Sequence, residues 1–526
     1  IVEDENDLEN ISLYKLACSY PLTNKKLLPW LKRLTTLVII EEKRGFLENE
    51  IREFCSKNNI QLEIHGKNLF QAFGGLTYEH VKTQLNFILN QVGITNCVYK
   101  SKEYFNVSEE LPKRLPTFCP GCPHRETLSL LKDLRKKLKE ENIDLITHGD
   151  VGCYSLSFLP PFKEMHNLSA MGQGGALGAG FDIFTTNPSV VLMGDSTFFH
   201  SGITDISNSV QLAHDITYIL LDNDNTAMTG HQMTPRTGVS VSGKIRPRQD
   251  MVTLVKSLGV EQIKEINPSD RYFYQNYLLN TVKKTGVKVI VSNKECALTY
   301  HGKLKSKETK IFKENKSLES KIFYQINTLS CEDCRECVEA TGCPGLTQIF
   351  DAYGPKVKID TQICVADSYC TKIKACPSFE KVIAKNYHPT KYRKKDQLDY
   401  DLKLKTPNIL KTFDHISDGN DLKIVVTGVG GSGVTTISRV LAEAAKSMGK
   451  RTDLDFKFMD QKGLAQRNGN VTGHLCIYKK GLSRGAITPL GSADLLLSPD
   501  LIDGAGQLKY LSKEGLAIFD NDFQVP

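Results

Sequence analysis

Residues 189–197 read SVVLMGDST, a buried-strand run that ends in a glycine, an aspartate and two hydroxyl residues. A second run, ITYILL at residues 216–221, leads into Asp-Asn-Asp-Asn. Strand-like runs that alternate with helical stretches predict a parallel sheet with helices on both faces. The carboxyl ends of neighbouring parallel strands meet at one edge of the sheet, where open α/β sheets bind their ligands. The two turns therefore predict a doubly wound α/β fold and the place of its site.

Further strands and helices extend this pattern in both directions. Strand-like runs occur at Asp144–His148 and Val287–Ser292, and the N-terminal part offers a strand at Thr36–Glu41 followed by a helix at Glu42–Cys55. We expect an α/β multidomain protein with the following parts: 1–110, an N-terminal α/β domain; 112–300, the doubly wound domain; 301–322, a polar linker; 323–385, a small cysteine-rich domain; 386–420, a second linker; and 421–526, a further α/β domain.

Composition places the chain among soluble globular proteins. It has 526 residues, of which 40% are hydrophobic and 24% charged, with a net charge of +7. That length predicts roughly three to four domains. The basic residues form no stripe with interleaved aromatics, which argues against nucleic acid as a partner. The longest apolar runs fall short of the ~18 residues that a membrane helix needs, and no signal peptide opens the chain. We expect a cytoplasmic location, and a chain that is part of a longer protein.

The turn after the strand at 189–193 has the residue types of a phosphate and metal site. Gly194 permits close approach of a ligand to the backbone, and amides at a helix N-terminus can bind phosphate. Asp195 and Asn223 offer hard oxygen ligands suited to Mg²⁺ with a diphosphate. The alternative is a pair of ordinary polar turns. Candidate cofactor-binding residues are Met171, Gly172, Gly194, Asp195, Ser196, Thr197, Asn223 and Asn225.

The fifteen cysteines are unevenly distributed. Four stand alone, namely Cys18, Cys55, Cys97 and Cys476. Without a secretory signal, C-x-x-C spacing indicates metal or cluster binding rather than disulfides. One such pair, together with two cysteines at the ends of strands, can converge on one [4Fe–4S] cluster, although the spacing leaves zinc and buried thiols open. This set is Cys119, Cys122, Cys153 and Cys296.

A denser group of cysteines lies between residues 331 and 376. C-x2-C-x2-C followed by a later C-P is typical of bacterial ferredoxins, in which the last cysteine of each run serves the other cluster. The first cluster would use Cys331, Cys334, Cys337 and Cys376. The second would have only Cys343, Cys364 and Cys370, so it could be a three-cysteine cluster, have a non-cysteine ligand or be absent. The segment has the pattern of a degenerate internal duplication, and zinc fits it poorly.

A glycine-rich loop follows the strand-like run KIVVT near the C-terminus. Residues 428–433 read GVGGSG, which is G-x-G-x-x-G between a strand and a helix, the dinucleotide-binding fingerprint of a Rossmann-like domain. Asp453 and Asp455 stand roughly where a ribose-binding acid is expected. The candidate ligand-binding residues are Gly428, Gly430, Gly431 and Gly433, and a nicotinamide site is one interpretation.

Four motifs together resemble one known family. FCPGCPHR, GDVGCYS, MGDSTFFHSG and LDNDNTAMTGHQ, spread over about residues 118–232, resemble the indolepyruvate branch of the 2-oxoacid:ferredoxin oxidoreductases. The resemblance implies thiamin diphosphate with Mg²⁺ on Asp195, Asn223 and the backbone carbonyl of Asn225. It also implies a [4Fe–4S] cluster close by on Cys119, Cys122, Cys153 and Cys296. The third position of the usual Gly-Asp-Gly motif is Ser196 here.

The flanking regions resemble other parts of the same enzymes. Residues 1–110, through TLVIIEEKRGFLENEIREF, resemble their transketolase C-terminal-like domain. Residues 323–385 correspond to a ferredoxin-like iron–sulfur domain. GVGGSGVTT, with the later run GLAQRNG at 463–469, resembles the gamma-type domain, here cut short by the end of the chain. That likeness implies coenzyme A or a structural phosphate contact at the glycine loop rather than NAD.

The activity that the resemblance implies is oxidative decarboxylation of a 2-oxoacid to an acyl-CoA, with the electrons passing through iron–sulfur clusters to ferredoxin in an anaerobic cell. Indolepyruvate and other aryl pyruvates are the favoured substrates. His124, His200 and His231 are candidates for contact with substrate or cofactor. The glutamate that activates the cofactor is expected outside this chain, so the chain alone should be inactive and should need a partner chain or a homo-oligomer. The alternatives are a non-catalytic electron-transfer subunit and a non-oxidative decarboxylase.

Overall fold

The computed structural model describes residues 10–22, 24–94, 104–112, 114–388, 420–449, 453–462, 469–482 and 484–520. Contacts divide the chain into two compact units, which are described separately. The first consists of residues 1–107, 487–496 and 507–517, and the second of residues 108–486, 497–506 and 518–526. Among the described residues, none of the helices has the length and apolarity needed to cross a bilayer. Cys97, most of the segment 386–420 and residues 463–468 lie outside these ranges.

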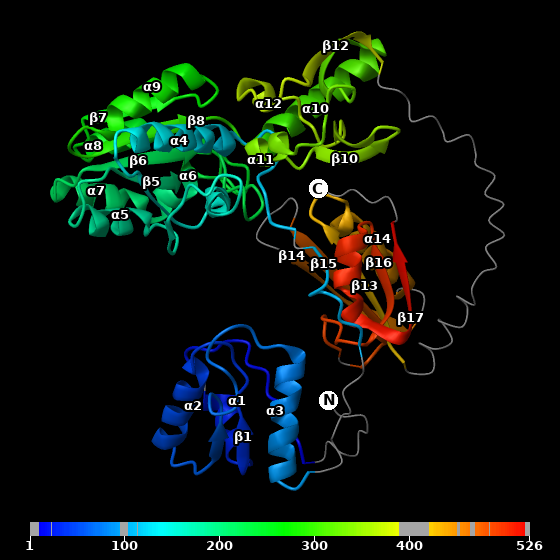
Figure 1. The fold of residues 1–526 in the computed structure, drawn as a ribbon. Helices are drawn as coiled ribbons and strands as arrows, with labels where there is room; N and C mark the ends of the chain where they lie inside the picture. The colour runs from blue at the N-terminus through cyan, green and yellow to red at the C-terminus, as the bar shows by residue number, and fades with distance from the viewer. Residues whose placement is uncertain are drawn as a thin grey trace. The chain divides into compact units, whose positions relative to one another are not determined.

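The second unit is built on a six-stranded sheet in which every pair of neighbours is parallel (Figure 1). The mixed α/β class with a parallel sheet is thereby confirmed. The predicted strands appear within two residues of their expected ends. The strand order is β4 (Asn167–Leu168), β3 (Ile146–Gly149), β5 (Ser189–Gly194), β6 (Ile216–Asp222), β8 (Lys288–Asn293) and β7 (Gln262–Ile266).

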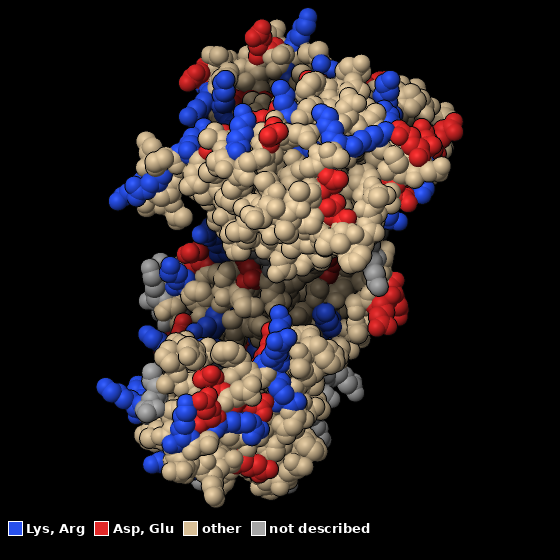
Figure 2. Space-filling view, turned by 90° about the vertical axis from the view of Figure 1, so that its left-hand side faces the viewer, with Lys and Arg blue, Asp and Glu red and all other residues tan. Residues whose placement is uncertain are grey.

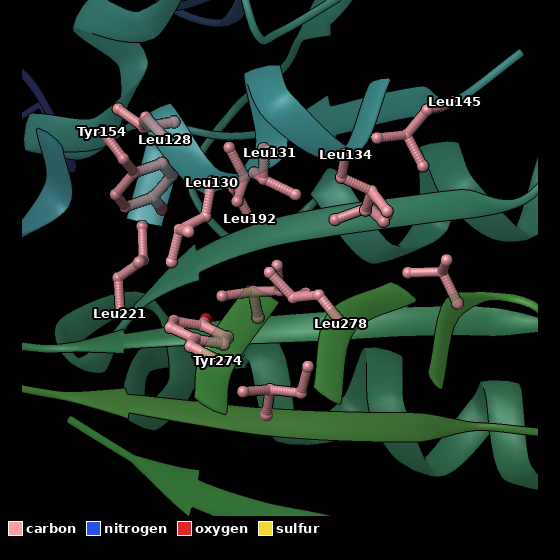
Figure 3. Close-up of a cluster of buried hydrophobic side chains, with 14 of the residues drawn as sticks. Leu128, Leu130, Leu131, Leu134, Leu145, Tyr154, Leu192, Leu221, Tyr274 and Leu278 are labelled. Atoms are coloured by element: carbon pink, nitrogen blue, oxygen red, sulfur yellow. The ribbon is translucent and has the colours of Figure 1, made fainter. Parts of the chain in front are cut away.

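Alternate residues of the central strands feed two separate cores, one on each face of the sheet. Along β5, Val190 and Leu192 join one core, whereas Val191 and Met193 join the other. Successive side chains of a strand point to opposite faces, which is why a strand buried on both faces is apolar throughout. The first core includes the side chains of Figure 3 and the leucines of α4 (Pro123–Glu140) with those of α9 (Arg271–Val282).

The second core lies under the helices of the opposite face. It contains Ala179 of α5 (Gly174–Asp182), Ile206 of α7 (Ile203–Gln211) and Val255 of α8 (Met251–Ser257). All three side chains are buried. Truncating one large apolar side chain in such a core costs about 2–5 kcal/mol. The two cores therefore hold the strand ends, and the turns that follow them, in fixed positions.

The stretch 301–322, for which composition favoured a linker, forms regular structure. Most of it belongs to α10 (Ala297–Asn315), and its end belongs to β9 (Leu318–Ile326). Lys and Glu favour helices and are also common in linkers. Composition therefore could not distinguish a helix from a linker in this stretch. The helix follows β8 after a short turn.

Two antiparallel pairs of strands frame the cysteine-rich segment. β9 pairs with β12 (Phe379–Tyr387), and β10 (Leu346–Asp351) pairs with β11 (Gly354–Ile359). Two short helices follow the cysteine loops, α11 (Glu336–Thr341) and α12 (Tyr369–Lys372). Every cysteine that the structure describes is free of disulfides.

The C-terminal sheet departs from the Rossmann pattern that the glycine motif predicts. In a dinucleotide-binding βαβ unit, the two strands on either side of the helix are parallel neighbours. Here α14 (Val434–Gly449) connects β13 (Leu422–Val429) to β14 (Leu454–Lys462), but β15 (Asn470–Lys479) lies between them and is antiparallel to both. The sheet order is β14-β15-β13-β16-β17, with β16 at Ala493–Ser498 and β17 at Leu511–Phe519, and α15 (Leu501–Gly506) joins these last two strands.

The N-terminal part of the first unit contains the strand and helix expected there. β1 (Thr36–Val38) pairs in parallel with β2 (Glu63–His65), and α2 (Phe46–Lys57) lies between them in sequence. The carboxylate of Glu41 accepts hydrogen bonds from the amides of the first turn of α2, Leu47 at 2.7 Å and Glu48 at 2.9 Å. A carboxylate on free helix amides stabilises a helix start. The other helices are α1 (Asn24–Leu31) and α3 (Tyr78–Gln91).

Charged side chains of both signs are interspersed on the face drawn in Figure 2. Basic and acidic residues alternate there over short distances. This mixing agrees with the small net charge of +7 over 526 residues.

Candidate active site

Two turns at neighbouring strand ends lie side by side in the second unit. β5 and β6 are paired in register up to Gly194 and Leu221, so the residues that follow them leave the sheet at the same edge. The hydroxyl groups of Ser196 and Thr226 are 2.7 Å apart and join the two turns. The juxtaposition that the sequence predicted for this edge is thus present in the fold.

Asp195 is a buried carboxylate with one oxygen to spare. Its side chain is 3% exposed. Oδ1 accepts hydrogen bonds from the amide and the hydroxyl of Ser196, at 2.6 and 3.2 Å. Oδ2 is buried and has no hydrogen bond of satisfactory geometry. Burial, followed by the negative charge of Asp222, raises the pKa of Asp195 to about 7. Because burial disfavours the charged form of this carboxylate, a nearby cation would stabilise that form.

Asn223 and Asn225 complete the set of oxygen donors. The amide of Asn225 donates to Asn223 Oδ1 at 3.2 Å, and Asn225 Nδ2 donates to the carbonyl of Asn223 at 3.3 Å. The backbone amide of Asn223 acts on the Asp195 carboxylate, so the turn lies beside it. Mg²⁺ prefers carboxylate, carbonyl and amide oxygens, so the residues present fit a magnesium ion.

A third strand-end turn supports the first two, and its aspartate was not among the predicted site residues. Asp150 follows β3 and is fully buried. It accepts hydrogen bonds from the hydroxyls of Tyr154 and Thr197, the latter at 3.3 Å. Burial raises the pKa of Asp150 to about 6, against the lowering effect of hydrogen bonds from Tyr154 and the Gly172 amide. The only available signal was a second Gly-Asp pair after a strand.

The Gly172 turn is packed too closely for any other residue. Gly172 has a φ of +82°, and a Cβ there would lie 1.6 Å from Ser201 Oγ. Ser201 donates to the carbonyl of Met171 at 3.4 Å. Ser201 belongs to a turn of π-helix at Phe198–Gly202, a feature that is frequent at functional sites. His200 lies in the same turn, bonded to Ser201 at 2.9 Å and exposed, so it does not line the pocket described next.

One pocket brings together the four cysteines, Asn223 and two of the candidate histidines. The remaining lining is largely apolar, with Leu156 and Met228 as examples. The lining residues are Thr117, Phe118, Cys119, Cys122, Pro123, His124, Cys153, Leu156, Asn223, Ala227, Met228, His231, Cys296, Ala297 and Leu298. Residues from four separate stretches of the chain therefore meet beside the Asp195 turn.

The thiols of this pocket influence one another and the carboxylate. Burial raises the pKa of Cys122 well above its usual value, and the neighbouring Cys119 and Cys153 raise it further. Burial also raises the pKa of Cys153 to about 12, with contributions from Cys119, Cys296 and Asp195. Thiols that repel one another's charge become thiolates when iron supplies the positive charge. The residues fit an iron–sulfur cluster.

Among the residues that the structure describes, no three His, Cys, Asp or Glu side chains are arranged as ligands of a single metal ion. In a [4Fe–4S] cluster each thiolate binds a different iron, so the four sulfurs surround a group much larger than one ion.

His124 and His231 hold the two asparagines from the pocket side. Asn223 Nδ2 is 3.4 Å from His124 Nε2, and Asn225 Oδ1 is 3.2 Å from His231 Nδ1. Burial lowers the pKa of His124 to about 4, so this imidazole is neutral at pH 7. Its Nε2 can then accept the side-chain amide proton of Asn223, whose Oδ1 accepts from the Asn225 amide.

The cysteines of the ferredoxin-like segment fall into two groups. Burial raises the pKa of Cys337 to about 11, and Cys376, Cys331 and Cys334 add to the rise. The second group surrounds Cys370, whose pKa burial raises to about 12 with help from Asp367, Cys343 and Cys364. The crossed pairing expected from the spacing agrees with this grouping.

Backbone amides in the segment donate to sulfur. The amides of Val357, Ala366 and Ser378 donate to the thiols of Cys331, Cys364 and Cys376 at 3.3, 3.4 and 3.4 Å.

The glycine loop before α14 needs glycine at three of its positions. Gly428, Gly431 and Gly433 have φ values of +154°, +101° and +94°. Such angles are open to glycine and are strained for other residues. The amide of Gly430 donates a hydrogen bond to the carbonyl of Gly469, at 2.7 Å. The loop thus has a strained glycine backbone, and the strands around it are not those of a dinucleotide-binding unit.

Comparisons with known proteins agree with the motifs. Residues 150–320 match the family model of the thiamine pyrophosphate enzyme C-terminal TPP-binding domain. Residues 1–103 match the indolepyruvate oxidoreductase domain, and residues 423–526 match pyruvate ferredoxin/flavodoxin oxidoreductase.

Curated relatives carry related names. The chain is 28% identical over 389 residues to indolepyruvate oxidoreductase subunit IorA of Pyrococcus horikoshii, which is 71% of this chain and 57% of that protein. It is 34% identical over 105 residues to subunit IorB of Archaeoglobus fulgidus, 20% of this chain and 49% of that protein. The chain thus spans about half of the length of the relatives that it matches. The resemblance predicted from the motifs is confirmed.

One solved structure is distantly similar. It is a 2-oxoglutarate:ferredoxin oxidoreductase from Magnetococcus marinus, with a TM-score of 0.32 and 17% identity over 37% of this chain and 72% of that one. A similarity of this size supports no statement about the fold.

Proposed function

We propose that this chain takes part in thiamin diphosphate-dependent oxidative decarboxylation of a 2-oxoacid, with electrons leaving through iron–sulfur clusters. The observation that supports this most strongly is the shared pocket, in which the Asn223 turn and the four thiols of Cys119, Cys122, Cys153 and Cys296 face the same space beside Asp195. A decarboxylase that does not oxidise its product has no use for such thiols.

The oxygen donors hold the anionic end of the cofactor. Asp195 Oδ2, Asn223 Oδ1 and the carbonyl of Asn225 would bind Mg²⁺, and the amides that follow Gly194 would bind the diphosphate. When bound, thiamin diphosphate supplies the electron sink that allows a 2-oxoacid to lose CO₂. Asp150 and Gly172 fix the third turn against the first two.

The apolar side chains beside Asn223 share their space with the four thiols, so they would enclose the proposed cluster. An apolar surrounding keeps water away from it. The proposed substrate is an aryl pyruvate such as indolepyruvate, which the names of the relatives support.

The thiols of the pocket and of the ferredoxin-like segment would hold the clusters that carry electrons away from the cofactor. The pocket thiols would hold one [4Fe–4S] cluster, and Cys331, Cys334, Cys337 and Cys376 a second. Cys343, Cys364 and Cys370 offer three ligands for a third. Ferredoxin is the proposed acceptor of the electrons, and coenzyme A the acceptor of the acyl group, with the glycine loop at 428–433 as its phosphate contact.

A partner supplies what this chain does not. We propose that the glutamate that activates the cofactor's aminopyrimidine comes from outside this chain, either from a partner chain or from a second copy. The existence of a separately named IorB subunit among the relatives supports a multi-chain assembly.

Dye reduction by the full-length protein with its partner tests the proposal. Anaerobic protein loaded with thiamin diphosphate and Mg²⁺ should reduce a viologen only when both a 2-oxoacid and coenzyme A are present. Release of CO₂ without dye reduction would instead indicate a non-oxidative decarboxylase. Iron–sulfur content with no binding of thiamin diphosphate would indicate an electron-transfer subunit, and either result would contradict the proposal.

A further inference from the structure

The ferredoxin-like segment consists of two halves that repeat with one constant offset. CEDCREC at 331–337 and CVADSYC at 364–370 are equivalent stretches, and each is followed at the same distance by Cys-Pro. Cys331, Cys337 and Cys343 therefore correspond to Cys364, Cys370 and Cys376. The secondary structure keeps the same offset, because α11 and α12 begin at equivalent residues, Glu336 and Tyr369.

The backbones of the two cysteine loops follow the same path. Asp333 and the equivalent Ala366 have φ values of +52° and +55°. Arg335 and the equivalent Ser368 both have +63°. Four non-glycine residues with positive φ are uncommon, and their occurrence at matching positions means that both loops have the same strained shape. Side chains at equivalent positions therefore leave the two loops in equivalent directions.

One position differs in a way that bears on chemistry. The slot that Cys334 fills in the first half is filled by Asp367 in the second. Asp367 lies among the thiols of the second group, since its charge raises the pKa of both Cys364 and Cys370. A carboxylate oxygen is an accepted ligand for iron, and ligands other than cysteine occur in iron–sulfur proteins.

A buried arginine completes this site from α4. Arg125 is 1% exposed, and its Nη2 donates to Asp367 Oδ2 at 3.2 Å. Its guanidinium lies over the ring of Tyr369, 4.6 Å from the ring centre, and the Tyr369 hydroxyl donates to the Arg125 carbonyl at 3.3 Å.

Two further donors of Arg125, Nε and Nη1, are buried without an acceptor. Leaving charged donors unpaired in the interior is costly, so an acceptor is expected beside them. The thiol of Cys343 contributes to the field at this guanidinium. A sulfur-rich anionic group among Cys343, Cys364 and Cys370 would supply that acceptor.

We propose that Cys343, Cys364, Asp367 and Cys370 hold a [4Fe–4S] cluster in which Asp367 Oδ1 binds the fourth iron. Arg125 binds the other carboxylate oxygen and donates its free N–H groups to the sulfur of the cluster. It acts as a positioning residue between α4 and the second half of the ferredoxin-like segment. The proposal rests on the iron–sulfur part of the proposed function and adds the ligand that the cysteine count lacks.

A carboxylate-bound iron leaves more easily than a thiolate-bound one. One-electron oxidation of a [4Fe–4S]²⁺ cluster followed by release of Fe²⁺ leaves a [3Fe–4S]⁺ cluster, with charge and atoms balanced. The full chain, purified without oxygen, is treated with about one equivalent of ferricyanide for each cluster, which takes up the electron. The EPR signal of a three-iron cluster should appear, with release of about one iron per chain. Iron-57 added under reducing conditions should return to that one site and be seen by Mössbauer spectroscopy.

Variants at residue 367 make the assignment specific. Asp367→Cys should give a cluster that keeps its fourth iron under the same oxidation. Asp367→Asn should contain about one iron fewer per chain before any oxidation, and ferricyanide should then produce the three-iron signal without further release of iron. Asp351→Asn, at the exposed end of β10, is the control and should behave as the unaltered chain. If the unaltered chain gives no three-iron signal, or if Asp367→Cys leaves the signal unchanged, the assignment is overturned. Absence of iron and sulfide from the whole chain would instead contradict the proposed function.

Discussion

The pocket at the sheet edge and the ferredoxin-like segment hold their cysteines in different surroundings. Burial raises the pKa of thiols in both regions, and backbone amides donate to thiols in both. The two regions differ in their contact with solvent. None of the four pocket cysteines is exposed and the pocket lining is largely apolar, whereas Cys334 of the segment is exposed. Burial disfavours the extra negative charge of a reduced cluster, whereas solvent favours it. The difference predicts that electrons move from the pocket to the segment.

The largest effect is expected when the Asp195 carboxylate beside the pocket is removed and the ferredoxin-like segment is left intact. Asp195→Ala deletes the buried carboxylate that faces the proposed Mg²⁺, and should weaken thiamin diphosphate binding by about 100-fold or more, since an ion contact in a buried site is worth several kcal/mol. Isothermal titration with Mg²⁺ present measures this. Asp144→Ala is the control, because Asp144 is an exposed residue paired with Lys139. Equal binding by both variants would refute the assignment of Asp195.

The next effect separates the two groups of cysteines by iron content. Cys153→Ser should remove about four irons per chain and leave the EPR signals of the segment unchanged. The exposed Cys18 provides the control, Cys18→Ser, which should lose none. Loss of iron from both regions in the Cys153 variant would show that they are not independent.

The reduction potentials test the direction of electron flow. The pocket cluster should have a potential at least about 60 mV below that of the first segment cluster, which for one electron is a factor of ten in equilibrium constant. An EPR-monitored redox titration of the full chain, with Cys153→Ser used to assign the pocket signal, measures both. A pocket potential above that of the segment would reverse the comparison.

The rigidity of the pocket can be tested at two glycines of one region. Gly172→Ala places a methyl group against Ser201 at a φ of +82°, and should weaken cofactor binding by about tenfold because the turn must move. Gly180→Ala in α5 meets nothing within 4 Å and should stabilise the helix slightly. Binding and thermal midpoints of both variants provide the measurement. A Gly172 variant that binds the cofactor normally would show that the turn does not contact it.

The smallest expected effect is a pH dependence at Asp150. Its pKa of about 6 in the folded chain exceeds the ordinary 3.8, so its ionisation opposes folding, and stability falls as the pH rises from about 4 to about 6. Asp150→Asn should gain a few degrees in thermal midpoint relative to the unaltered chain between pH 4.5 and 6.5.

Asp144→Asn is a control of opposite sign. A hydrogen bond from Lys139 lowers the pKa of this exposed carboxyl, so its charged form favours the fold. The thermal midpoint of this variant should equal that of the unaltered chain, or lie slightly below it, over the same pH range. A midpoint difference for Asp150→Asn that does not change with pH would contradict the raised pKa.

Local patterns predicted the elements that depend on neighbours in sequence. The strands at 189–194 and 216–222 and the turns after them followed from apolar runs ending in Gly and Asp. The sequence did not reveal the role of Asp150, because one of its partners, Thr197, lies 47 residues further along the chain. The role of Arg125 was not predicted either, because it depends on contacts with residues more than two hundred positions away along the chain.

Two sequence patterns occur in two kinds of structure each, and they led to a wrong prediction of the linker and of the C-terminal sheet. The Lys- and Glu-rich stretch after residue 300 suits a linker and a helix equally, and α10 shows that it forms a helix. The glycine loop at 428–433 has the same local form in parallel and mixed sheets, so only the position of β15 reveals the difference.

The central claim is that the magnesium turns and the pocket cluster share one space, and a magnetic measurement tests it directly. Mn²⁺ can replace Mg²⁺ beside Asp195, and a paramagnetic cluster nearby would speed the relaxation of its EPR signal. Reduction of the full chain with thiamin diphosphate bound should therefore enhance Mn²⁺ relaxation, and Cys153→Ser should abolish the enhancement. Mn²⁺ relaxation that is the same in the oxidised and reduced protein, with both sites shown to be filled, would contradict the account.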